Sequence, residues 1–143
     1  MNGDPIPDTD HVLRHVNGRL LQGEDIDGSG FRLRENETTL SFAWVEYYRN
    51  HSPDEQIQLI RDTFPLRLKK KDKFAELNIG FAKRHVNSEH PENKIIDFIE
   101  DGIFKDGIPL FPSHCFMTCE PDLDAMIGDL LAECILAKFP AIP

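Results

Sequence analysis

The segment at residues 38–48 (TTLSFAWVEYY) constrains the fold more than any other part of this chain. It is rich in threonine, aromatic and β-branched residues, which fit the pleated surface of a strand. Alternate side chains of a strand point to opposite faces, so Leu40, Phe42 and Trp44 would share one face while the other face is also apolar. A strand that is apolar on both faces is usually central in its sheet, and the segment predicts such a strand.

Shorter segments of similar composition predict further strands in the same sheet. These are residues 31–34, 74–79 and 95–99. Gly80 would end the second of them, and the polar residues 85–93 predict a loop. The Asp-Gly pairs at residues 101–102 and 106–107 predict tight turns. The basic stretch at residues 66–73 predicts an exposed strand end followed by a turn.

Two helices are expected, one inserted among the strands and one near the C-terminus. Ser52, Pro53 and Glu55 form a capping-box pattern, with proline at the first helical position and Pro65 as the stop. Residues 122–139 predict the strongest helix because their apolar positions recur with helical spacing. The apolar positions of this stripe are Leu123, Met126, Ile127, Leu130, Leu131, Cys134 and Ile135.

The sequence pattern of residues 11–21 fits either a helix or a strand. Val12, Val16 and Leu20 are spaced by four residues, which suits one face of a helix. The same valines would also share one face of a strand, followed by a turn at residues 17–18.

The order of these elements predicts an α+β domain. We expect an antiparallel sheet of about five strands, with one inserted helix and a C-terminal helix packed on it. The length of 143 residues fits one domain at residues 1–143, and residues 1–10 would be an irregular N-terminal arm.

Charge and cysteine content restrict the expected partners and compartment. Lysine and arginine number 16 against 25 acidic residues, which gives a net charge of −9. This charge makes nucleic acid and anionic membranes poor partners. No apolar run is long enough for a membrane helix, and the N-terminus lacks the pattern of a secretory signal. An odd number of cysteines suits reduced thiols in the cytoplasm.

The pair His114-Cys115, together with Cys119, is the first candidate site. Thiolate and imidazole groups bind zinc, and a thiol beside a base can act as a nucleophile. If the segment is a strand, however, the two thiols lie roughly 13 Å apart and the adjacent His114 points to the opposite face. A zinc site would also need a distant histidine, and buried packing is the simpler role for these cysteines.

Glu46 is the fourth residue of the candidate cluster, with His114, Cys115 and Cys119. It is singled out because a charged residue in an otherwise apolar strand needs a partner or water. Arg14 or Arg32 could supply that partner.

Asp25, Asp27 and Ser29 resemble the first half of a calcium-binding EF-hand loop. Position twelve of such a loop would be Asn36 instead of a glutamate, and an extended segment follows where a helix is required. These residues therefore predict an acidic surface loop, and we expect no bound metal or other cofactor.

The strongest positive feature is a basic cluster that follows the first predicted helix. It contains Arg67, Lys69, Lys70, Lys71 and Lys73. It could bind phosphate, nucleic acid or an acidic partner. Lysines at the end of a strand also prevent edge-to-edge pairing.

Four runs of residues resemble those of small bacterial proteins to which no activity is attached. They are residues 31–34 (FRLR), 40–46 (LSFAWVE), 74–78 (FAELN) and 112–114 (PSH). The resemblance implies a bacterial cytosolic origin and assigns no functional residue.

The favoured hypothesis is a small accessory protein that binds a partner protein without catalysis. The chain contains ten phenylalanines and lacks the sequence motifs of common enzyme classes. One alternative is a metal- or thiol-dependent hydrolase that uses His114, Cys115 or Cys119. The other is binding of nucleic acid or phosphate through Lys69 to Lys73.

Overall fold

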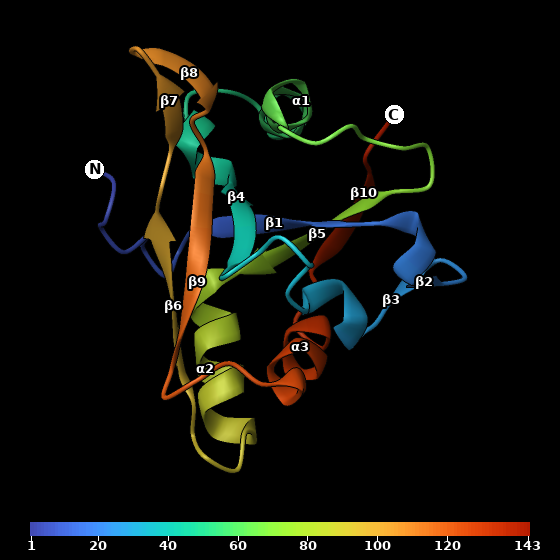
Figure 1. Cartoon of the computed structure of the whole chain (residues 1–143), viewed down its shortest axis with the longest axis vertical. Coiled ribbons are helices and arrows are strands. Elements are labelled where there is room, and N and C mark those ends of the chain that lie inside the picture. Colours follow the sequence, from blue (N-terminus) through green and yellow to red (C-terminus); the bar gives the residue numbers. More distant parts are fainter.

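The computed structural model describes residues 1–143, and its centre is a six-stranded sheet (Figure 1). Its strands are β1 (His11–Val16), β4 (Leu40–Trp44), β5 (Lys73–Asn78), β6 (Ile95–Glu100), β9 (His114–Glu120) and β10 (Ala137–Pro140). They lie in the order β10-β5-β1-β4-β9-β6, and every neighbouring pair is antiparallel. The predicted α+β class is confirmed, with one strand more than expected.

The remaining elements connect or cover this sheet. Three helices are present: α1 (Pro53–Thr63), α2 (Ile79–Glu89) and α3 (Ala125–Ala132). Two short antiparallel ladders lie outside the sheet: β2 (Leu21–Gln22) with β3 (Asp25–Ile26), and β7 (Ile103–Lys105) with β8 (Ile108–Phe111). Three 3₁₀ turns complete the chain: η1 (Gly18–Leu20), η2 (Gly28–Phe31) and η3 (Val45–Tyr48). None of the helices is both long and apolar enough to cross a membrane.

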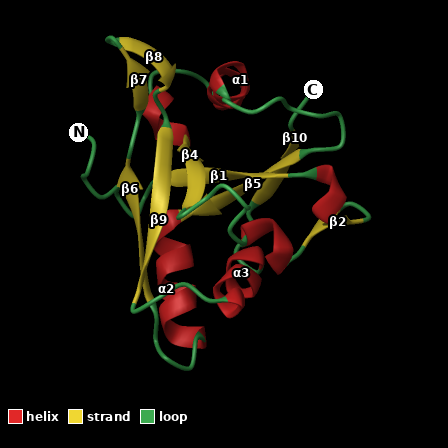
Figure 2. Ribbon diagram, viewed as in Figure 1, coloured by secondary structure: helices red, strands yellow, loops and turns green.

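The sheet is covered on both faces, as the central segment predicts. Helices α2 and α3 cover one face, and α1 lies over the other (Figure 2). Val12 and Phe42 belong to the larger core under α2 and α3, whereas Leu13 and Ala43 belong to the smaller core under α1. The alternation along β1 and β4 therefore separates two cores that share one sheet.

The central strand is confirmed, but it is shorter than residues 38–48. Strand β4 pairs with β1 and β9 and ends at Trp44, where η3 begins. The Glu46 carboxylate accepts the backbone N–H of His11 at 2.7 Å, and a side chain thus takes the place of a ladder carbonyl. This bond satisfies the backbone N–H of His11 in β1, so β4 does not have to extend further to pair with it.

The capping box is confirmed at α1. Ser52 Oγ accepts the Glu55 N–H at 3.3 Å, and Glu55 Oε1 accepts the Ser52 N–H at 3.2 Å. The helix ends at Thr63, ahead of Pro65, as predicted.

The strand predicted at residues 74–79 is confirmed as β5, but the loop predicted at residues 85–93 is wrong except at residues 90–93, because a helix replaces the rest. Helix α2 begins directly after β5, and the Asn78 side chain caps it by accepting the Phe81 N–H at 2.9 Å. Ile79, Ala82 and Val86 are buried, at the spacing of three and four residues that one helix face requires.

A C-terminal helix is present as predicted, but it is shorter than the predicted range of residues 122–139. Helix α3 covers only eight residues, with the Asp124 carboxylate as its cap, and the chain then forms β10. Strand β10 pairs with the otherwise free edge of β5, and the Leu136 N–H bonds to the Glu76 carbonyl at 2.8 Å. Pairing along that edge outweighs helical propensity at residues 133–139.

Three smaller predictions are settled by the structure. Residues 11–21 contain strand β1 and turn η1, whereas residues 31–34 are not a strand. The arm at residues 1–10 is irregular but not free, because Ile6 is buried and its N–H bonds to the Phe98 carbonyl.

Candidate functional site

A cavity of about 620 Å³ opens on the sheet face that α1 covers only in part. Its floor is formed by Leu13 and His15 of β1, Ser41 of β4 and His114 of β9. Its walls come from residues 32–37, from Phe64, Pro65 and Leu66 after α1, and from Ile103 and Phe111 of the β7–β8 ladder. This volume is typical of small-molecule sites, which measure roughly 300–1,000 Å³.

The buried ring of His15 is held between the carboxylate of Asp72 and the guanidinium of Arg34. Its Nε2 lies 2.9 Å from Asp72 Oδ2, and its Nδ1 lies 2.9 Å from Arg34 Nη2. A guanidinium can only donate, so Nδ1 accepts and Nε2 carries the proton that bonds to Asp72. Burial lowers the pKa of His15, which also favours this neutral form. His15 therefore positions Arg34 and has no free nitrogen for a substrate.

His114, on the same cavity floor, carries its proton on the other ring nitrogen, Nδ1. Its Nδ1 lies 3.0 Å from the Asp101 carbonyl oxygen and 3.1 Å from the Asp101 carboxylate. Both are acceptors, so Nδ1 carries a proton. No protein group bonds Nε2, which leaves that nitrogen available in a neutral ring.

Arg14 supports the wall at residues 32–37 from inside the protein. Its side chain is 1% exposed, and all five of its N–H groups are used. Two of them bond to the Glu37 carboxylate at 2.8 and 3.0 Å. The same carboxylate accepts the backbone N–H groups of Arg34 and Ser41. This network fixes the backbone from which Arg34 extends.

The predicted thiol site is not assembled. His114 lies in the cavity, but Cys115 points to the opposite face, where it is fully buried in the larger core. Burial raises the pKa of the Cys115 thiol well above its usual range, and it also raises that of Cys119. Both cysteines therefore stay protonated near neutral pH and serve as packing groups.

The predicted partner of Glu46 is wrong. Glu46 bonds to His11, with 2.7 Å between Oε2 and Nδ1, whereas Arg14 pairs with Glu37 and Arg32 with Asp129. Glu46 and the two cysteines lie outside the cavity lining.

The loop that resembles half of an EF-hand is organised by its own hydrogen bonds. Asp27 caps η2 by accepting the N–H of Ser29 at 2.9 Å and its hydroxyl at 2.5 Å. Asp25 lies in β3, 3.7 Å from the ammonium of Lys138. The 3₁₀ turn η2 lies inside this loop, and strand β4 follows Asn36, where an EF-hand requires a helix.

The basic cluster lies in the connection between α1 and β5, and its last member, Lys73, is the first residue of β5. Lys73 pairs with Glu24 at 3.5 Å, while the other four cations have no carboxylate within 4 Å. Lys71 packs against Gly18, where a Cβ atom would come within 2.6 Å of the Lys71 Cβ. Because the neighbouring Asn17 and Arg19 line the cavity, Lys71 lies next to its rim.

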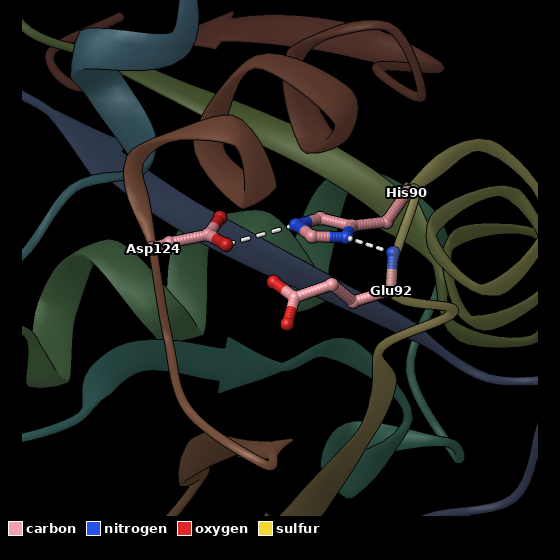
Figure 3. A group of neighbouring side chains, drawn as sticks. All are labelled: His90, Glu92 and Asp124. Carbon is pink, nitrogen blue, oxygen red and sulfur yellow. Dashed lines mark hydrogen bonds and ion pairs between the residues drawn. The ribbon is translucent and has the colours of Figure 1, made fainter.

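A second polar group, which the sequence reasoning missed, joins α2 to α3 (Figure 3). His90 Nε2 lies 2.8 Å from Asp124 Oδ2, and the Glu92 N–H donates to His90 Nδ1 at 3.0 Å. The ammonium of Lys94 is 3.7 Å from both Glu92 and Asp124. Neither ring nitrogen is free, and Lys94 already supplies the positive charge, so this group is an ion-pair network and not a metal site.

The ladder of β7 and β8, with its turn, forms an apolar hairpin (residues 103–111) that extends beyond the end of the sheet (Figure 1). The predicted turn is confirmed, since Asp106 and Gly107 both have positive φ. Phe111 alone is buried. The exposed apolar residues are Ile103, Phe104, Ile108, Pro109 and Leu110.

The buried His15–Asp72 pair predicts a loss of stability in acid. As pH falls through about 6.5, an unfolded histidine gains a proton that the folded His15 resists, which favours unfolding. Burial raises the pKa of Asp72, but hydrogen bonds from Gly18, His15 and Lys69 outweigh this effect and lower it overall. The stability from Asp72 is therefore lost only below about pH 4.

The test is the free energy of unfolding in urea at about pH 7.5 and 5.5. We expect His15→Gln, whose amide can both donate and accept, to reduce the difference between the two pH values. His51→Gln, at an exposed histidine, should leave that difference unchanged. An equal pH dependence in the wild type and His15→Gln would contradict this assignment.

No protein-family model matches the chain, and no curated protein or solved structure is significantly similar to it. The candidate site therefore rests on the geometry of this chain alone.

Proposed function

We propose that the chain is an accessory protein that binds a partner protein through the apolar hairpin. The observation that carries the proposal is the exposure of Ile103, Phe104, Ile108 and Leu110 on one short ladder. Their exposed fractions run from 39% to 62%. Contiguous exposed apolar surface of this kind is typical of protein interaction sites.

The hairpin contributes little to the folded core. Only Phe111 enters a core cluster, and Ile103 reaches the edge of the cavity. The apolar residues beyond them are therefore not explained by packing. Burying their surface against a partner would be worth roughly 25 cal/mol for each Å² removed from water.

The chemistry near the hairpin favours a protein partner over an anionic membrane. The net charge of −9 opposes approach to an anionic surface. The tip carries Lys105 and Asp106, one charge of each sign, which suits the polar rim of a protein interface. Leu33 and Leu66 are also exposed and extend the apolar surface around the cavity mouth.

The experiment compares two double variants as bait in cells of the native host. Phe104→Ser with Ile108→Ser removes the hairpin surface, whereas Ile95→Ser with Leu136→Ser removes two similarly exposed apolar residues elsewhere. Captured chains are identified by cross-linking and mass spectrometry. The leading partner is then purified and titrated into each variant.

We expect the hairpin variant to bind the purified partner at least about 30-fold more weakly, because buried aromatic anchors dominate interfaces. The control variant should bind as the wild type does. Equal affinities for the two variants would refute the proposal. A concentration-dependent dimer in sedimentation that the hairpin variant abolishes would also refute it, since the hairpin would then join copies of this chain.

A further inference from the structure

The cavity contains a guanidinium whose hydrogen-bonding capacity is only partly used. Arg34 Nη2 donates to Nδ1 and to the carbonyl oxygen of His15. The Nε–H and both Nη1–H groups have no protein acceptor, and Arg34 has no carboxylate within 4 Å. A half-buried guanidinium with three free donors matches an oxyanion, which accepts two parallel hydrogen bonds.

The charges around the mouth favour a negative ligand. Arg19 is exposed, lines the cavity and has no carboxylate partner. Lys71 of the basic cluster, which has no carboxylate within 4 Å, packs against Gly18 beside this rim. Glu35 is the one unpaired acid in the lining, because both oxygens of Glu37 are bonded to Arg14. The local field is therefore positive in a protein of net charge −9.

The rest of the lining is apolar and aromatic. Phe64 and Phe111 lie 5.5 Å apart between ring centroids, and Phe111 lies 5.4 Å from the ring of His114. Leu13 forms part of the floor, and the half-exposed Leu66 forms part of the wall. These side chains offer a surface for a ring or a branched aliphatic group, and the free Nε2 of His114 can accept one hydrogen bond from it.

We infer that this cavity binds a small amphipathic anion, with its carboxylate or phosphate at Arg34 and its apolar body against Phe64, Leu66 and Phe111. The site shares Ile103 with the apolar hairpin but not Phe104, Ile108 or Leu110, and its occupancy does not depend on a partner protein. Arg34 is held in place for this contact by His15, by Asp72 behind His15, and by the Arg14–Glu37 network beneath residues 32–37.

The test is a titration of the full isotopically labelled chain, followed by amide and arginine Nε–H resonances. The probes are 3-phenylpropionate, phenyl phosphate, inorganic phosphate and the neutral 3-phenylpropan-1-ol. We expect the first two to shift the resonances of Arg34 and the cavity floor at millimolar concentration. The stronger of the two identifies the charged group that the site prefers.

Four variants locate the binding. Arg34→Gln should weaken the better aromatic anion about 10-fold or more, since hydrogen bonds to charged groups are among the strongest in proteins. Arg19→Gln, which leaves the His15 network intact, and Leu66→Ser should each weaken it about 3-fold. Arg84→Gln removes an exposed arginine of α2 on the other side of the sheet and should change nothing.

Several results would overturn the inference. The neutral alcohol could bind as well as the anions, or inorganic phosphate could bind as well as phenyl phosphate. Affinity could also survive Arg34→Gln in a variant whose spectrum shows a folded chain. Lys70→Gln could weaken binding while Arg34→Gln and Arg19→Gln do not, which would place the anion on the basic cluster outside the cavity. The absence of any shift in the wild type would equally end the proposal.

Discussion

Replacing Arg14 by methionine is expected to lower the free energy of unfolding by about 3–5 kcal/mol. The substitution leaves the Glu37 carboxylate without its cation and removes the donors for the carbonyl groups of Gly30, Arg32 and Ser41. The Arg14 side chain is 1% exposed and that of Glu37 is 12% exposed, so water cannot replace these bonds without local opening. Methionine keeps the apolar part of the side chain, and the loss therefore reports the polar network.

Urea denaturation at neutral pH measures this change. Arg61→Met is the matched control, because Arg61 is an arginine on the surface of α1 that bonds to the Pro140 carbonyl. It should cost about 1 kcal/mol or less. The double variant Arg14→Met with Glu37→Met should lose less than the sum of its single variants, since no charge is then left unpaired. A loss near that of Arg61→Met would show that the network contributes little.

The parts of the fold that local chemistry determines were predictable from the sequence. The capping box at Ser52 and Glu55 and the turn at Asp106 and Gly107 each depend on a few adjacent residues. The central position of β4 follows from its two apolar faces. Local sequence carried the information in each of these cases.

Helix α2 could have been predicted, because its signals are also local. Asn78 is a good N-cap, and Ile79, Ala82 and Val86 have helical spacing. Gly80 concealed the pattern because glycine disfavours helix interiors. Its position is explained by a distant contact, since a Cβ atom there would lie 3.0 Å from the carbonyl oxygen of Asp8.

Strand β10 and the cavity could not be derived from local patterns. Residues 137–140 become a strand only because the edge of β5 is free to pair with them. His15, Arg34, Phe64 and His114 come from four separate segments that the sheet and its loops bring together. The sequence identified His114 as a candidate, but it linked that residue to cysteines that lie on the other face of β9.

Replacing Phe98 by alanine is expected to cost about 3–5 kcal/mol of stability, whereas the same change at Phe104 should cost about 0.5 kcal/mol or less. Phe98 is fully buried in β6 and packs edge-on against Phe42, with 5.1 Å between ring centroids. Phe104 lies on the apolar hairpin and is 49% exposed.

Because the two substitutions remove the same atoms, the difference in their unfolding free energies reports burial alone. Phe98→Leu should recover much of the loss, since leucine refills most of the space. A cost at Phe104 comparable with that at Phe98 would mean that the hairpin is part of the core. A small cost would leave its exposed phenylalanine unexplained by folding, as partner binding through this hairpin requires.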